Sequence, residues 1–244
     1  MQHTFARLGR VLFGVYATLT FAAATLVSVA LLALTPGLVR RRRIVRGTAR
    51  SVFHLTGTRL VISGLSHIPA QPCIIVANHA SYLDGPILTA ALPARFSFVI
   101  KREMTRVPLA HFLLRRIGSE FVERNDAHKS AADARRILQK ARAKESLAFF
   151  PEGTFTAESG LRRFHNGAFA AALRGQVPVV PVVIRGSRQM LPAERALPRP
   201  GRIDVIVKPA LLPSATTSVA ELLMEARRSI LADLDEPDLH PPRA

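Results

Sequence analysis

The sequence predicts an α/β fold, with a mostly parallel mixed sheet covered by helices and an N-terminal membrane helix or helical hairpin. Short apolar runs typical of buried strands alternate with longer amphipathic segments typical of helices. Several apolar runs end directly in polar residues, which is where ligands bind in open α/β sheets. An uncharged stretch near the N-terminus predicts the membrane element.

Residues 11–34 form a stretch of 24 residues without a charged side chain. As a helix they would measure about 36 Å, which is enough to cross a hydrocarbon core of about 30 Å. A secretory signal peptide fits poorly, because the apolar core is long and arginines stand where a cleavage site would be. The break at Pro36-Gly37 leaves a second arrangement open, in which the helix dips into one leaflet and returns.

Six arginines follow this stretch between residues 40 and 50, whereas Arg7 and Arg10 precede it. By the positive-inside rule, the rest of the chain is expected on the cytoplasmic side of the cell inner membrane. The arginines at 40–43 are either a solvated flank or a contact with anionic headgroups, worth about 1 kcal/mol per side chain. Residues 44–55 predict a short amphipathic helix. We therefore expect a membrane anchor at 1–57 and a globular domain at 58–244.

The net charge of +17, from 34 basic and 17 acidic residues, favours an anionic partner such as a phospholipid surface, nucleic acid or a phosphate-bearing substrate. Nucleic acid is not expected, because the chain has no Trp and its arginines are not interleaved with aromatic residues. The lone Cys73 lies in an apolar run and is expected to be buried and inert. Without a Cys/His array of zinc spacing, the sequence predicts neither a metal nor a cofactor.

Seven strands are predicted in the globular part, at residues 59–63, 73–77, 95–101, 118–124, 146–150, about 180–184 and 202–208. Helices are predicted at residues 87–92, 108–117, 127–144, 168–173 and 219–234. Pro178 and Pro181 argue against a regular central strand over all of residues 177–184, so this strand is expected to start near Val180. Residues 236–244 are expected to be frayed.

His79 and Asp84 follow the apolar run 73–77 and precede the helix at 87–92. Their spacing lets a turn bring the Asp84 carboxylate onto the His79 ring. A carboxylate on one imidazole nitrogen fixes the tautomer and leaves the other nitrogen as a general base. No protein nucleophile accompanies the pair, so the nucleophile would be a hydroxyl of the substrate. The alternative is structural, with His79 capping the helix and Asp84 solvating its first turn.

A second polar turn, Pro151-Glu152-Gly153-Thr154, follows the strand expected at 146–150. Proline fixes its backbone, and glycine lets the backbone approach a ligand closely. Arg124 ends another strand, on the edge of the sheet where His79 is expected. Arg124 is either an exposed surface residue or an anion clamp, for which the guanidinium fork is suited.

Four stretches together resemble the glycerolipid acyltransferase family, whose best-known members are 1-acylglycerol-3-phosphate (lysophosphatidate) acyltransferases. The first is Asn78-His79 followed by four residues and Asp84, and the second is the strand that ends in Arg124. The third is Phe-Pro-Glu-Gly-Thr at 150–154, and the fourth is the Val-Pro-rich run 177–183. The resemblance covers residues 60–210, and it is specific because all four stretches occur in this order and at these separations.

The resemblance implies a membrane-bound enzyme that moves a fatty acyl group from acyl-CoA or acyl-carrier protein to the free hydroxyl of a lysophospholipid. The expected acceptor is 1-acylglycerol-3-phosphate, which would give phosphatidate. His79 would take the hydroxyl proton, Asp84 would stabilise the imidazolium, and Arg124 would grip the acceptor phosphate. The other positions carried over are Glu152, Gly153 and Thr154 for substrate binding, and Asn78 and Pro151 for structural support.

The chain departs from the family pattern after the third stretch. The family often has Arg-Ser there, whereas this chain has Phe155-Thr156. Either Arg162 or Arg163 replaces the missing cation, or the acceptor lacks a phosphomonoester, as in a lyso-aminolipid such as lyso-ornithine lipid.

Two other classes of protein are less consistent with the sequence. A hydrolase needs an activated Ser or Cys, and the chain has no Gly-x-Ser-x-Gly nucleophile elbow. A non-catalytic, membrane-tethered lipid-binding module accounts for the charge, but it leaves His79, Asp84 and Glu152 at the strand ends unexplained. An acyltransferase accounts for both features.

Overall fold

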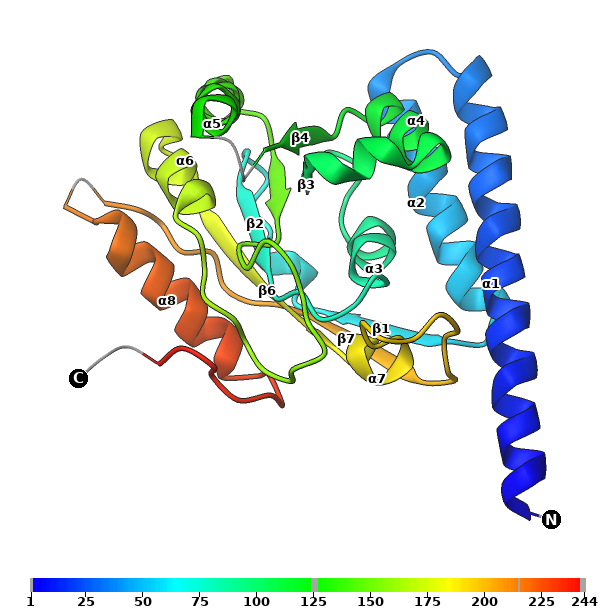
Figure 1. Cartoon of the computed structure of the whole chain (residues 1–244). Helices are drawn as coiled ribbons and strands as arrows, with labels where there is room; N and C mark the ends of the chain where they lie inside the picture. The colour runs from blue at the N-terminus through cyan, green and yellow to red at the C-terminus, as the bar shows by residue number, and fades with distance from the viewer. Residues whose placement is uncertain (1, 124–126, 215, 242–244) are drawn as a thin grey trace.

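The computed structural model of the protein describes residues 2–123, 127–214 and 216–241 (Figure 1). Within these residues, a seven-stranded sheet has the order β1-β7-β6-β2-β5-β3-β4. All neighbouring strands are parallel except β6 and β7. The predicted α/β class with a mostly parallel mixed sheet is therefore confirmed. The strands are β1 (Arg59–Ser63), β2 (Ile74–Ala77), β3 (Ser97–Lys101), β4 (Glu120–Val122), β5 (Leu147–Phe149), β6 (Val179–Arg185) and β7 (Arg202–Val207).

Helices cover both faces of the sheet (Figure 1). Helices α2 and α3 pack on one face, and helices α5, α6 and α8 pack on the other. Every residue of the central strand β2 is buried, as expected for a parallel strand covered on both sides. The helices are α1 (Gln2–Leu34), α2 (Leu38–Leu55), α3 (Asp84–Ala91), α4 (Pro108–Arg116), α5 (Ala127–Arg142), α6 (Gly167–Gly175), α7 (Ser187–Met190) and α8 (Val219–Leu231), with 3₁₀ turns η1 (Leu65–His67) and η2 (Arg102–Arg106).

The strand β6 accommodates Pro181 opposite the end of β7, where its missing N–H costs at most one hydrogen bond. It begins at Val179, one residue before the predicted start. The Pro181 carbonyl accepts from the Lys208 N–H at 2.9 Å, just beyond the end of β7. Because N–H and C=O of one strand residue point the same way, the missing N–H of Pro181 would face the end of β7. The sheet therefore loses little pairing there.

Helices α1 and α2 form an antiparallel hairpin that turns at Gly37, where φ is +82°. At one end the Tyr16 hydroxyl donates to the Leu55 carbonyl at 3.1 Å, and nearer the turn the Ser28 and Thr48 hydroxyls lie 2.7 Å apart. By length and composition, one helix over Arg7–Leu34 could cross a membrane, and 17% of its most apolar window is buried. The hairpin therefore leaves a large apolar face of α1 exposed.

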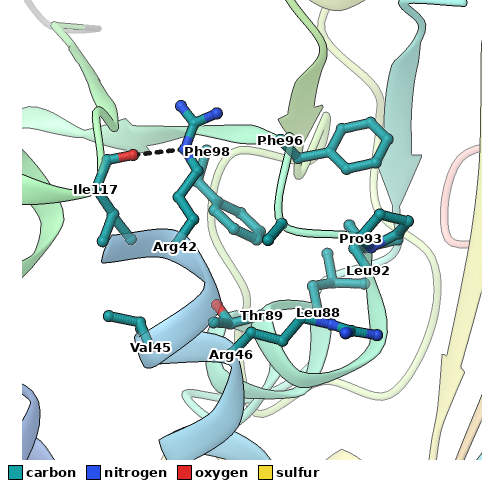
Figure 2. A pocket seen from close by; sticks show the side chains of 11 residues that line it. Arg42, Val45, Arg46, Leu88, Thr89, Leu92, Pro93, Phe96, Phe98 and Ile117 are labelled. Carbon is teal, nitrogen blue, oxygen red and sulfur yellow. Dashed lines mark hydrogen bonds between the residues drawn. The ribbon is translucent and has the colours of Figure 1, made fainter. Parts of the chain in front are cut away.

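Arg42 is neither solvated nor free to contact headgroups, the two alternatives expected for the arginines at 40–43. It lies within α2 and is half-buried, and it donates to the carbonyls of Ile117 and Arg95 at 2.9 and 2.7 Å. Its third partner is the Ser97 hydroxyl. Figure 2 shows Arg42 beside a cavity of about 20 Å³ between α2 and α3, which has room for about one water molecule. Arg42 thus joins α2 to the strand β3 and the end of α4, whereas Arg40 and Arg43 remain exposed.

The expectation that residues 236–244 are frayed is wrong for residues 236–240. These residues make main-chain hydrogen bonds with the loop at 160–161, and their acidic side chains pair with buried or half-buried arginines. Sequence composition could not reveal these partners, because they lie far away along the chain. Residues 242–244 lie outside the described residues.

Candidate active site

His79 and Asp84 meet where β2 ends and α3 begins. The Nδ1–H group of His79 donates to the Oδ2 atom of Asp84 at 2.9 Å, while the Asp84 side chain is fully buried. The same oxygen accepts from the N–H groups of Ala80 and Ser81 at 2.6 and 2.8 Å. Because this oxygen also accepts from two main-chain N–H groups, the hydrogen-bond pattern assigns the Nδ1 proton to His79. The Nε2 atom of His79 is left with a lone pair that can accept a proton.

The imidazole ring of His79 is enclosed by aromatic side chains. Phe150 stacks on it with ring centroids 4.2 Å apart, and Phe155 approaches it edge-on at 4.6 Å. Tyr82 in turn meets Phe155 edge-on at 4.7 Å. The His79 side chain is 17% exposed, so part of the ring remains accessible. This wall limits the ring to one orientation and shields it from bulk water.

Glu152 accepts a hydrogen bond from the main chain of His79. The residue is 4% exposed, and one carboxylate oxygen accepts from the His79 N–H at 2.6 Å. The other oxygen accepts from the Arg162 N–H at 2.8 Å. Burial raises the pKa of Glu152 to about 7, although both N–H donors lower it. Because both oxygens bind main-chain groups, this geometry favours a positioning role for Glu152 over contact with the acceptor.

The other residues of the second polar turn are also arranged to shape the main chain. Gly153 has φ of +81°, a conformation that suits glycine, and its N–H donates to the Phe150 carbonyl at 3.0 Å. That bond engages the Gly153 N–H within the turn itself. The Pro151 carbonyl accepts from the His165 N–H at 2.8 Å, and Thr154 is exposed.

Asn78 ties the His79 turn to a neighbouring strand. Its Nδ2 group donates to the Ile184 carbonyl at 2.9 Å, and its Oδ1 atom accepts from the Ile184 N–H at 2.7 Å. Both bonds are buried and link the end of β2 to β6. Asn78 therefore has the contacts of a structural brace. Arg124, the predicted phosphate clamp, lies outside the described residues.

A cleft of about 740 Å³ opens beside this arrangement, over the carboxyl ends of β3 and β5 and between α5 and α6. Its volume is in the range of about 300–1,000 Å³ that is usual for small-ligand sites. The polar turn at 151–154 forms one wall. The sequence reasoning missed the rest of the lining, which combines apolar side chains such as Val99, Ile137 and Leu138 with charged ones such as Lys101, Glu103 and Arg174. A cleft with apolar and charged parts can accept an amphiphilic substrate.

A partly exposed histidine paired with a buried aspartate at the carboxyl edge of a parallel sheet, beside an amphiphilic cleft, fits a protein that activates a substrate hydroxyl. The chain belongs to the acyltransferase family, whose sequence profile matches residues 59–185. The chain is 29% identical over 175 residues to a chloroplastic 1-acyl-sn-glycerol-3-phosphate acyltransferase of Brassica napus, which covers 70% of this chain and 49% of that protein. It is 38% identical over 128 residues to the lyso-ornithine lipid O-acyltransferase of Pseudomonas aeruginosa, which covers 52% of this chain and 48% of that protein.

The chain thus spans about half the length of these two relatives. The match to the mouse 1-acyl-sn-glycerol-3-phosphate acyltransferase alpha is longer, at 29% identity over 198 residues, or 79% of this chain and 70% of that protein. Among solved structures, the fold is similar to the 1-acyl-sn-glycerophosphate acyltransferase of Thermotoga maritima, with a TM-score of 0.78 and 21% identity. That similarity covers 92% of this chain and 94% of the other.

Proposed function

We propose that this protein transfers a fatty acyl group from a thioester donor, acyl-CoA or acyl-carrier protein, to the free hydroxyl of a lysophospholipid. The observation that carries the proposal is the bond between His79 and a buried Asp84, in a chain of the acyltransferase family. The His79 Nε2 atom accepts the hydroxyl proton as the alcohol oxygen attacks the thioester carbon. Asp84 stabilises the imidazolium, which returns the proton to the departing thiolate. The products are an ester and a thiol, and no acyl-enzyme is needed.

For the acceptor, we propose 1-acylglycerol-3-phosphate, with phosphatidate as the product. Support comes from relatives in plants and mouse that carry this activity in their names. Arg124 would hold the acceptor phosphate, and Thr154 and Gly153 would border the bound lipid. One observation favours a second acceptor: Phe155 packs against His79 at the position where the family often has an arginine. The Pseudomonas relative, named a lyso-ornithine lipid O-acyltransferase, is consistent with that acceptor. A lyso-aminolipid acceptor would not need that cation.

Residues 1–57 would anchor the enzyme to the inner membrane, with residues 58–244 as the catalytic domain on its cytoplasmic side. Of the two membrane arrangements, the contacts of α1 support the one confined to one leaflet. Hydrogen bonds tie α1 to α2 and to Arg116 of α4. They are spread along α1 from Tyr16 to Leu32, which is about 24 Å of helix. If α1 crossed the bilayer in this conformation, the arginines of α2 would enter the hydrocarbon core, which costs about 3 kcal/mol or more for each.

Turnover by the purified protein tests the proposed function. The assay combines labelled acyl-CoA or acyl-carrier protein with lysophosphatidate, lyso-ornithine lipid and other lysolipids on anionic vesicles. We predict that His79→Ala lowers kcat by about 10²-fold or more, because the general base is lost, while vesicle binding is kept. The exposed His54 provides a control, since His54→Ala should leave kcat unchanged. Binding without turnover by the wild-type chain would instead support a lipid-binding module, and full turnover by His79→Ala would exclude His79 as the base.

A further inference from the structure

The C-terminal residues 236–240, here called the tail strap, are hydrogen-bonded to residues 154–163, here called the site loop (Figure 1). The Leu161 N–H donates to the Pro237 carbonyl at 2.8 Å, and the Leu239 N–H donates to the Leu161 carbonyl at 3.1 Å. Glu236 accepts from the Gly160 N–H at 2.8 Å. These bonds join the end of the chain to the loop that follows the second polar turn.

Two arginines outside both segments hold them together. Arg188, in α7, donates to the Glu236 carboxylate at 2.8 Å and to the Thr156 carbonyl of the site loop at 2.7 Å. The side chains of Arg188 and Glu236 are each 11% exposed. The guanidinium group of Arg188 therefore binds both segments. Removing the tail strap would leave this largely buried group without its carboxylate partner.

Arg227, in α8, repeats this arrangement at the other end of the site loop. It is 3% exposed and pairs with Asp238 of the tail strap. It also donates to the carbonyls of Leu161 and Arg162, and it lies over the Phe164 ring. A buried guanidinium needs such partners, since an unpaired buried charge is strongly destabilising. The Arg227–Asp238 pair therefore fixes the main chain at residues 161–162.

The site loop, held in place by the tail strap, is connected to the proposed base His79 in two ways. The Arg162 N–H donates to Glu152, whose other oxygen accepts from the His79 N–H. Phe155, near the start of the loop, makes the edge-on contact with the His79 ring. The position of His79 therefore depends on a loop that the C-terminus holds in place.

Gly160 shows that the tail strap and the site loop are in close contact. Its φ of +140° is rarely adopted by other residues, and a Cβ atom there would lie 2.6 Å from Cγ of Leu239. The same Cβ atom would lie 2.8 Å from the Pro237 carbonyl oxygen. An alanine at this position would thus push the two segments apart without changing any charge.

We propose that the tail strap is a positioning element for acyl transfer, which holds His79 in its reactive position through the site loop and Glu152. Glu236, Asp238, Arg188 and Arg227 are positioning residues in this arrangement, and none of them contacts His79 itself. The kinetic part of the proposal rests on the proposed acyltransferase function. The structural part, coupling between the C-terminus and the His79 turn, does not.

The first test compares a chain that ends at Asp235 with a control that ends at Pro241, which keeps the whole strap. Steady-state kinetics on lysolipid vesicles should show a fall in kcat of about 10-fold or more for the shorter chain, because small displacements of a catalytic group are costly. The KM values for donor and acceptor should change less than about 3-fold, since most of the cleft lining lies on β3, α5 and α6, away from the tail strap. Hydrogen exchange should rise in residues 154–163 and also in residues 79–81.

A second variant keeps the test decisive if the shortened chain does not fold. Gly160→Ala retains every charged side chain and should give the same pattern of lowered kcat and raised exchange. The matched control is Asp235→Asn, next to the strap, where an exposed carboxylate pairs with Arg185 and contributes little. That variant should keep the kcat and the exchange of the wild type.

Unchanged kcat in both strap variants would overturn the proposal, as would raised exchange confined to residues 154–163. A fall in kcat without raised exchange at residues 79–81 would also overturn it, because the effect would then bypass the site loop. If the wild-type chain transfers no acyl group to any lysolipid, the proposed function fails. The exchange at residues 79–81 then decides alone whether the strap positions His79.

Discussion

Glu152 is a buried carboxyl group whose protonation should affect the stability of the fold. Burial raises its pKa to about 7, whereas in the unfolded chain it ionises near 4.5. Between these values the folded protein binds more protons than the unfolded chain, so the stability contributed by this group falls as pH rises. The full effect is about 3 kcal/mol once the pH exceeds the folded pKa.

We predict that Glu152→Gln removes this pH dependence, because glutamine does not ionise. Chemical unfolding of both chains at about pH 5 and about pH 8 checks it: the wild type should lose about 2 kcal/mol or more relative to the variant at the higher pH. Comparing the two chains cancels the contributions of other titrating groups. A difference that is the same at both pH values would mean that Glu152 is already ionised in the folded protein throughout this range.

Phe155 provides a test of the acceptor at the residue scale. It occupies the position where the family often has arginine, and it lies against His79 and Tyr82. We predict that Phe155→Arg raises the kcat/KM ratio of lysophosphatidate to lyso-ornithine lipid by about 10-fold, because a charge-assisted bond to a phosphomonoester becomes available. Competition assays with both acceptors measure this ratio, which is insensitive to a general loss of activity. Phe155→Leu is the control and should leave the ratio unchanged.

The His79–Asp84 contact could be predicted from the sequence because it is local. Asp84 follows His79 by only five positions, and a strand followed by a helix leaves few ways to close such a turn. The partners of Glu152 could not be predicted, because its contacts come from His79 and Arg162 on separate segments. A sequence pattern shows that a carboxylate follows a strand, but not whether it faces a ligand or the protein's own main chain.

At the scale of elements, the strands were predictable because β2, β5 and β6 are short, buried apolar runs. The start of α2 was missed, since four consecutive arginines look like a uniformly solvated segment. In a helix from Leu38, however, Arg42 falls on the same face as the buried Val45 and Phe53. Extending the 3.6-residue period by one turn would have placed Arg42 against the domain.

We predict that Arg42→Ala destabilises the fold by about 2 kcal/mol, because three buried or half-buried acceptors lose their donor. Arg43→Ala serves as the control, since Arg43 is exposed and should change the free energy of unfolding by no more than about 0.5 kcal/mol. Unfolding in detergent measures both values. Equal effects of the two substitutions would contradict the role of Arg42 as the link between α2, β3 and α4.

At the scale of the whole molecule, the α1–α2 hairpin is the element proposed to meet the bilayer. The apolar stretch by itself permitted both crossing and dipping, because its length satisfies either arrangement. The packing of α1 along α2 favours dipping, and this packing depends on contacts that the sequence alone does not reveal. In the dipping arrangement, residues before α1's apolar stretch and residues of the globular domain lie on the same side of the membrane.

We predict that a cysteine at Gly9 and a cysteine at Ala143 are labelled by an impermeant maleimide from the same side of sealed vesicles. Both positions are exposed, and Gly9 has open space around it. The native Cys73 should stay unlabelled, because it is fully buried and burial raises its thiol pKa to about 11. Labelling of the two positions from opposite sides would mean that α1 crosses the bilayer. The hairpin packing would then have to open in the membrane, since it cannot coexist with a crossing helix while α2 keeps its arginines in water.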